Sequence, residues 1–268
     1  MFARKALLAA TAALAALASG APGAGASITA LPAQRSAATV ADAISAQPGL
    51  VRRAWFSAAP PAGRPVAVAT TRLAGFPRPR ASSGRYAILS TGDATLAGRG
   101  NDSTFTGRDA GGPSIRGAFD VTILRIDLRI PRGASCVSFD VRLLSDEYRE
   151  AIGTQFGDMF VAELGESNWR IGAPPLTALT APRNIAASGG QPMTITDSGF
   201  SAMSSSRSAG TTYDGATRLI RVAGPVTAGD AILFMSVLER GDRLYDTSAF
   251  IDNLRASSPS ACSTRVLG

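Results

Sequence analysis

The sequence contains no histidine, and its single lysine is Lys5. Without histidine, the chain cannot form a Ser-His-Asp or Cys-His catalytic arrangement, and it cannot bind zinc or haem through an imidazole ring. Without a lysine beyond position 5, the rest of the chain cannot form a Schiff base or build a conventional phosphate-binding loop. The chemistry that remains is that of carboxylates, arginine, tyrosine and hydroxyl groups.

Long apolar runs are scarce, and the one at the N-terminus is short. Arg4 and Lys5 precede an apolar run over residues 6–18, and Ala24-Gly25-Ala26 then places small residues where a signal peptidase reads them. This three-part pattern predicts a cleavable signal peptide over residues 1–26. An alanine-rich helix of the mature fold is the alternative. The run of about 13 residues is shorter than the roughly 20 that span a bilayer.

Removal of the signal peptide leaves 242 of the 268 residues and lowers the formal net charge from +7 to +5. The arginines are scattered rather than gathered into a basic patch, so we expect no nucleic-acid partner. No later segment has 18 consecutive apolar residues, so we expect no transmembrane segment in the mature chain. The predicted location is secreted and extracellular, periplasmic or associated with the cell surface.

Cysteine is nearly absent too, since the chain has only Cys136 and Cys262. An even number in an exported chain favours a disulfide over two separate thiols. A bridge between them closes a loop of about 126 residues, which the chain-entropy model values at roughly 4–5 kcal/mol. It would tie the C-terminal tail to the body of the domain.

Many short apolar stretches separated by glycine and proline turns predict a β-sandwich. Apolar and charged residues alternate over 124–130, and the same alternation returns over 137–144, as in half-buried strands. Further strands are expected over 50–57, 66–71, 86–90, 159–164, 193–196, 216–222, 231–238 and 250–254. The predicted fold is all-β, a jelly-roll-like β-sandwich with one short N-terminal helix and long loops.

The domain organisation follows from these patterns. Residues 27–38 are rich in alanine, serine and proline and predict a flexible leader. A short helix is expected over 39–47, with Thr39 as its N-cap, since the apolar residues that follow have helical spacing. One sandwich domain then covers residues 39–256, and residues 257–268 form a C-terminal tail.

Acidic residues gather where strands are expected to end. Glu147 follows one strand, Asp158 precedes the next, and Asp246 and Asp252 flank the last. Calcium takes six to eight oxygen ligands in flexible geometry and is available outside the cytoplasm, so these four residues are the candidate calcium ligands. The alternative is that they cap turns or pair with nearby arginines.

Two other functions remain open at this point. Glu147 and Asp158 are a candidate acid and base for a carbohydrate-active hydrolase. A binding module for an extracellular glycan or surface protein is the other possibility, and aromatic side chains usually line such sites. Trp169 lies in a polar stretch, where it is either exposed for binding or packed beneath the neighbouring loop.

Four stretches of the chain carry short motifs in a fixed order and spacing. They are Tyr86–Asp93 (YAILSTGD), Phe139–Leu164 (FDVRLLSDEYREAIGTQFGDMFVAEL), Asn184–Ala186, and Tyr213–Thr217 (YDGAT) leading to Val237–Leu254 (VLERGDRLYDTSAFIDNL). Together they resemble the bacterial choice-of-anchor L domain of exported and surface proteins over about residues 39–255. The resemblance implies export and a non-enzymatic surface role, without naming a ligand.

The acidic motif of that family is the best matched part. The matching positions are Ser145, Glu147, Tyr148 and Asp158. The chain departs from the family pattern at Gly157, where asparagine is usual, and at Thr247, which stands where serine often follows aspartate. The resemblance and the residues together favour an exported binding or adhesion module that calcium stabilises, with the hydrolase as the alternative.

Overall fold

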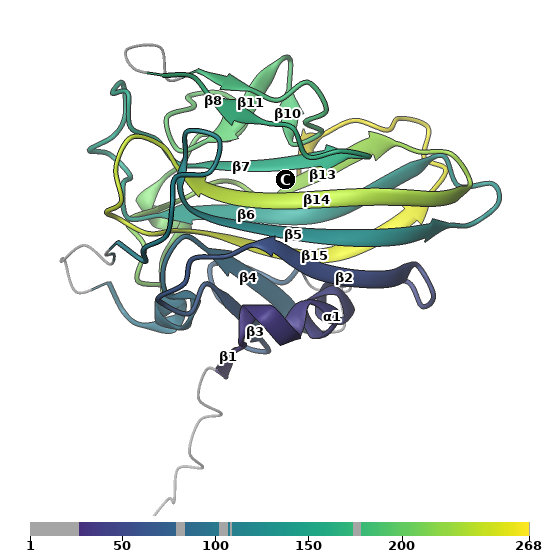
Figure 1. The fold of residues 1–268 in the computed structure, drawn as a ribbon, viewed down its shortest axis with the longest axis horizontal. Helices are drawn as coiled ribbons and strands as arrows, with labels where there is room; N and C mark the ends of the chain where they lie inside the picture. The colour runs from purple at the N-terminus through teal and green to yellow at the C-terminus, as the bar shows by residue number, and fades with distance from the viewer. Residues whose placement is uncertain (1–26, 79–83, 102–106, 108, 174–177, 268) are drawn as a thin grey trace, which may run out of the picture.

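The computed structural model describes residues 27–78, 84–101, 107, 109–173 and 178–267, so the predicted signal peptide lies outside the described residues. Two antiparallel β-sheets pack face to face, with one helix against their side (Figure 1). This confirms the predicted β-sandwich with one short N-terminal helix. No helix in the described ranges is long and apolar enough to cross a membrane.

One sheet has six strands in the order β10-β11-β7-β14-β5-β2. These strands are β2 (Val51–Ala58), β5 (Phe119–Ile130), β7 (Met159–Leu164), β10 (Ala187–Ser188), β11 (Gln191–Thr194) and β14 (Gly229–Glu239). Its centre is the long pairing of β5 with β14, which runs from Ile130 opposite Gly229 to Phe119 opposite Glu239. The strand predicted over 231–238 is therefore confirmed and extended at both ends.

The other sheet has eight strands, ordered β1-β3-β4-β15-β6-β13-β16, and β12 also pairs with β6. These strands are β1 (Ile28–Ala30), β3 (Val66–Ala69), β4 (Tyr86–Ser90), β6 (Cys136–Ser145), β12 (Gly215–Ala216), β13 (Ile220–Pro225), β15 (Thr247–Ser257) and β16 (Arg265–Val266). The single strand expected over 216–222 is in fact two, because the chain passes from β12 to β13 within it.

The hydrophobic core lies between the two sheets and follows the period-two pattern of the sequence. Leu124, Ile126 and Leu128 of β5 face Phe139 and Val141 of β6 across it, and all five are buried. The charged residues between them point to the outer faces, because successive side chains of a strand alternate. The alternation predicted over 124–130 and 137–144 thus marks the buried faces of both sheets.

The helix α1 (Ala33–Ile44) begins six residues before the predicted start at Thr39. Pro32 stands at its N-cap, and the strand β1 precedes it, so residues 27–38 belong to the fold rather than to a flexible leader. Alanine is the best helix former, which explains the earlier start. The helix closes the side of the sandwich through Ala33, Ala37, Val40, Ala41 and Ile44. Two short 3-10 helices, η1 (Ala94–Gly98) and η2 (Ser205–Arg207), lie in loops.

Cys136 and Cys262 form the predicted disulfide, with their Cα atoms 5.7 Å apart. The bridge joins the start of β6 to the segment before β16, which pairs with β13. The expected C-terminal tail is therefore docked on the eight-stranded sheet. A disulfide of this kind indicates an oxidising, extracytoplasmic environment.

A small hairpin covers part of the outer face of the six-stranded sheet (Figure 1). It consists of β8 (Arg170–Ile171) and β9 (Leu179–Thr180). Trp169 is fully buried beneath it, and its Nε1–H donates a hydrogen bond to Ser236 Oγ at 3.1 Å. Of the two interpretations of Trp169, packing is the one that the structure supports, and this residue is not a binding platform.

Candidate functional site

The candidate site lies at one end of the sandwich, where six central strands begin or finish. In the eight-stranded sheet, Thr247 at the start of β15 lies opposite Ser145 at the end of β6. In the six-stranded sheet, Glu239 at the end of β14 lies opposite Phe119 at the start of β5. Both sheets therefore bring their loops to the same end of the core.

Six carboxylate side chains are buried at this end, none of them more than 3% exposed. They are Asp120, Asp146, Glu147, Asp158, Glu239 and Asp246. Acidic residues are almost never fully buried unless they are paired or bind a metal, because removal of a charge from water costs several kcal/mol. A group of six therefore requires a physical explanation.

The strands of the six-stranded sheet bring three of these acids into the core. Asp120 is buried at a register shift in the pairing of β5 with β14, and Asp158 continues the buried face of β7 that contains Phe160. Glu239 follows Val237 of β14 by two residues in the same way. The six-stranded sheet thus replaces its apolar residues by carboxylates in the last layer of the core.

The opposite sheet supplies hydroxyl groups at the same level. Ser145, Thr91 and Thr247 are fully buried and hydrogen-bonded to one another. The Thr247 hydroxyl donates to Ser145 Oγ at 2.7 Å, and the Thr247 N–H donates to Thr91 Oγ1 at 3.0 Å. This end of the core is therefore a polar layer, made of carboxylates from the strand ends of both sheets and of hydroxyls from the eight-stranded sheet.

Glu147 and Asp158 form the closest pair of predicted site residues. The Asp158 N–H donates to Glu147 Oε2 at 3.1 Å, and the Arg240 N–H donates to Asp158 Oδ1 at 3.2 Å. Burial raises the pKa of Glu147 to about 8. Burial, and then the neighbouring charges of Glu147 and Glu239, raise the pKa of Asp158 well above its usual range. The two carboxyls therefore resist ionisation together.

Glu239 is the centre of the cluster, because it interacts with acids on both sides of it. Burial raises its pKa to about 10, and the charges of Asp120, Asp246 and Glu147 add to the effect. Among the described residues, no donor meets normal hydrogen-bond geometry with either of its carboxylate oxygens. Thr91 lies close enough to lower the pKa slightly, but its hydroxyl already faces Thr247.

Asp246 is held by the loop that follows β4. The Asp93 N–H donates to Asp246 Oδ2 at 3.2 Å. A Cβ atom on Gly92 would lie only 1.9 Å from that same oxygen. Glycine at position 92 is therefore required for the Asp246 carboxylate to occupy this place, since any side chain would displace it.

Two arginines place positive charge near the cluster in the described part of the chain. The Arg240 guanidinium interacts with Asp158 and Glu147, and burial lowers its pKa. Arg243 Nη1 lies 3.9 Å from Asp120 Oδ1 and makes a shorter ion pair of 3.0 Å with the exposed Asp109. Two guanidinium groups do not balance six carboxylates, so full ionisation would leave excess negative charge.

Backbone strain accompanies the cluster. Asp120, Tyr245 and Arg149 have φ values of 41°, 65° and 100°, in the region that non-glycine residues rarely adopt. Asp120 belongs to the cluster, and the other two lie within two residues of Asp246 and Glu147. Such strain is characteristic of sites that the rest of the fold holds in place.

The four predicted calcium ligands do not all meet. Glu147, Asp158 and Asp246 lie in the cluster at the strand ends. Asp252 is buried elsewhere, opposite Asp140 of β6 and beside a β-bulge of β15. It is five residues from the start of β15 at Thr247, about 17 Å along the strand.

Asp252 instead belongs to a polar patch on the eight-stranded sheet. Arg221 makes a bidentate ion pair with Asp140 at 2.7 and 2.9 Å, and Asn253 Nδ2 donates to the same carboxylate at 2.8 Å. The Asn253 N–H donates to Asp252 Oδ1 at 2.6 Å. This patch is a paired network with its own cation, unlike the cluster at the strand ends.

In the described ranges, no group of three or more His, Cys, Asp or Glu side chains already stands in an arrangement that could hold a metal ion. Models of known protein families and curated protein sequences give no match to this chain. The resemblance to the choice-of-anchor L domain therefore stays a prediction.

Proposed function

We propose that this protein is an exported, non-enzymatic binding module, and that its buried carboxylate cluster takes up a calcium ion that stabilises the fold. The observation that carries the proposal is Glu239, a fully buried carboxylate with no hydrogen-bond donor of normal geometry on either oxygen among the described residues. Buried polar atoms in native proteins are nearly always satisfied, so such a group suggests an ion or protons at this place.

The donor set fits calcium by its chemistry. The six carboxylates offer only oxygen, in a group without histidine or cysteine, and calcium selects six to eight oxygens in flexible geometry. The residues that would hold it are those whose charges act on Glu239 or Asp158, namely Asp120, Glu147, Asp158, Glu239 and Asp246. Some side chains must rotate for their oxygens to converge. The bound ion would supply the positive charge that Arg240 and Arg243 do not.

The hydrolase alternative finds less support. A glycoside hydrolase needs two carboxyl groups that flank the bond of a bound sugar. Glu147 and Asp158 are 3% and 0% exposed, and they accept backbone hydrogen bonds rather than face an open cleft. A polysaccharide panel tests this directly, since turnover by the native chain that is lost in Glu147→Gln would restore the enzyme hypothesis.

A calorimetric calcium titration of the mature chain tests the proposal. We expect one ion to bind with a dissociation constant in the range of extracellular modules, about 10⁻⁴–10⁻³ M. Glu239→Gln, which keeps the size of the side chain and removes its charge, should weaken binding at least tenfold. Glu166→Gln is the matched control, because Glu166 is largely exposed and lies outside the cluster. No heat of binding, or an equal loss in both variants, would refute a calcium site here.

A further inference from the structure

The outer face of the six-stranded sheet carries a second group of polar and aromatic side chains. The β8–β9 hairpin covers one part of this face, and the rest is open. Three rows of side chains cross the open part from β2 through β5 to β14, as the strand register dictates. Side chains of successive rows are about 7 Å apart along each strand, because every second residue faces outward.

The first row is aromatic and cationic. It consists of Trp55, Arg125 and Phe234, which lie opposite one another in the register. The Arg125 guanidinium lies 4.3 Å from the Trp55 ring centroid and 5.5 Å from that of Phe234. This stacking fixes the orientation of the indole, which is still 36% exposed. Trp55 is the most exposed large aromatic side chain in the described part of the molecule.

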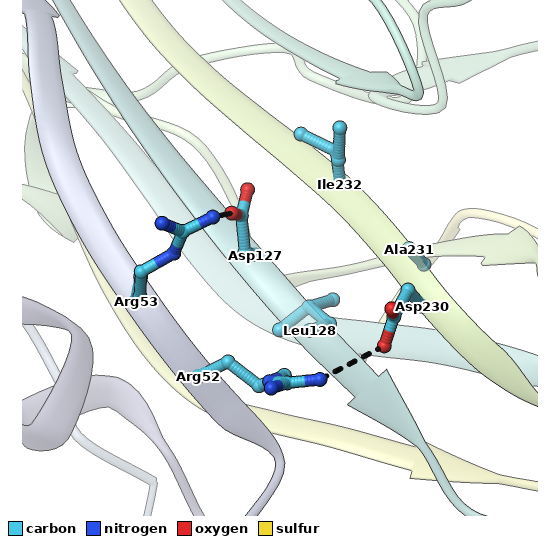
Figure 2. A pocket seen from close by; sticks show the side chains of 7 residues that line it. All are labelled: Arg52, Arg53, Asp127, Leu128, Asp230, Ala231 and Ile232. Carbon is cyan, nitrogen blue, oxygen red and sulfur yellow. Dashed lines mark hydrogen bonds and ion pairs between the residues drawn. The ribbon is translucent and has the colours of Figure 1, made fainter.

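The other two rows combine arginine with aspartate. Figure 2 shows that Arg53 pairs with Asp127 and that Arg52 reaches Asp230, at 3.1 and 3.4 Å. Asp127 also binds Arg125, and Asp230 also binds Arg129 at 3.0 Å. Arg52, Arg53, Asp127 and Asp230 line a shallow cavity of about 460 Å³ between β2, β5 and β14.

Each carboxylate of this face is therefore shared by two arginines. The four guanidinium groups outnumber the two carboxylates, which leaves a local charge of +2 on an exposed surface. Arg53, Arg129 and Arg52 have 75%, 60% and 55% of their side chains exposed. A guanidinium has five N–H donors in a fork that fits carboxylate and sulfate groups, so most donors here face solvent.

We propose that this face, the arginine–tryptophan face, binds an acidic polysaccharide. Arg52, Arg53 and Arg129 take its carboxylate or sulfate groups, and a sugar ring packs against Trp55. An open sheet face with cations in successive rows and one exposed indole suits a repeating polymer. An acidic peptide would not need the indole. The inference rests on the proposed function only in assuming an exported binding module, since the face is on the opposite side of the sheet from the carboxylate cluster.

Affinity electrophoresis of the mature chain in calcium-containing buffer tests the inference. The gels contain hyaluronan, dextran sulfate, neutral dextran or polyglutamate. We expect retardation by hyaluronan, dextran sulfate or both, and none by neutral dextran. Binding to hyaluronan alone identifies a uronate, binding to dextran sulfate alone identifies a sulfate ester, and binding to both supports the shared anion chemistry.

Two variants locate the site. Arg53→Gln with Arg129→Gln should raise the dissociation constant about tenfold, because it removes two exposed anion contacts. The double variant Arg99→Gln with Arg265→Gln is the control, since it removes the same charge from exposed positions outside this face. Trp55→Ala should weaken polysaccharide binding severalfold and leave any binding to polyglutamate unchanged.

Several results would overturn the inference. They are the absence of binding to both acidic polysaccharides, equal binding to neutral dextran, and an equal loss in the control variant. Polyglutamate binding as tight as hyaluronan binding, together with no effect of Trp55→Ala, would point to an acidic peptide instead. A chain that binds calcium but no polysaccharide would refute this inference alone, and the proposed calcium site would stand.

Discussion

The stability of the calcium-free protein should fall steeply as the pH rises from 5 to 8. The pKa of Glu147 is about 8 in the folded chain and 4.5 in a free side chain. Between these values, the folded chain holds a proton that the unfolded chain has released, so each pH unit lowers the free energy of unfolding by about 1.4 kcal/mol. Glu147 alone therefore removes about 4 kcal/mol over these three units.

Glu239 strengthens the effect, because its pKa of about 10 lies above the whole window. A loss of this size is a large part of the roughly 5–15 kcal/mol that stabilises an ordinary domain. Asp109 and Asp230 do not interfere, since hydrogen bonds from Gly111 and Arg129 respectively lower their pKa values below the usual range of an aspartate.

Urea unfolding at pH 5 and pH 8, with a chelator and with excess calcium, measures this effect through tryptophan fluorescence. Calcium replaces the protons of the cluster, so it should restore stability at pH 8 and have a smaller effect at pH 5. In the chelator, Glu147→Gln should reduce the difference in unfolding free energy between pH 5 and pH 8 by about 4 kcal/mol, the contribution of Glu147. Equal stability at both pH values in the chelator would show that the cluster is ionised and compensated without metal, which would refute the reasoning.

Two further predictions test the glycine next to the site and the disulfide at the opposite end of β6. Gly92→Ala should destabilise the protein by about 2–3 kcal/mol and weaken calcium binding, because the new methyl group displaces the Asp246 carboxylate. Gly100→Ala is the control in the same urea titration. It should have little effect, because a Cβ at that position would meet nothing within 4 Å. Replacement of Cys136 and Cys262 by serine should lower the unfolding free energy by about 2–5 kcal/mol in the same assay, and no change would refute a stabilising role for the bridge.

The sequence predicted the sandwich well because its buried strands alternate clearly. The strand over 86–90 and the disulfide were predicted in full, and both are confirmed. The short strands β1, β8, β9, β10 and β16 were missed. They have two or three residues each, too few for alternation to be recognised, and their pairing depends on distant segments.

The candidate site was only half predictable. Glu147, Asp158 and Asp246 stood out because they flank expected turns. Asp120 was overlooked because it lies at a register shift between β5 and β14, which alternation does not predict. Glu239 was overlooked although the same alternation that predicted the strands places it on the buried face of Val237. The signal was present, but an acidic residue in a buried position is usually interpreted as the end of the strand. Asp252 was included because it follows the same motif, and only the pairing of β15 with β6 shows that it lies apart.

The disulfide and the proposed calcium site lie at opposite ends of one strand, and this separation predicts that their effects on stability are independent. The disulfide holds Cys136 at the start of β6, and the cluster lies beyond Ser145 at its end, about 30 Å away. Effects at sites that far apart should add within about 0.5 kcal/mol. Reduction and chelation together should therefore lower the unfolding free energy by the sum of their separate effects. Since both conditions prevail inside a cell, we expect the chain to reach full stability only after export. A reduced, calcium-free protein as stable at pH 8 as the oxidised, calcium-bound one would contradict this expectation.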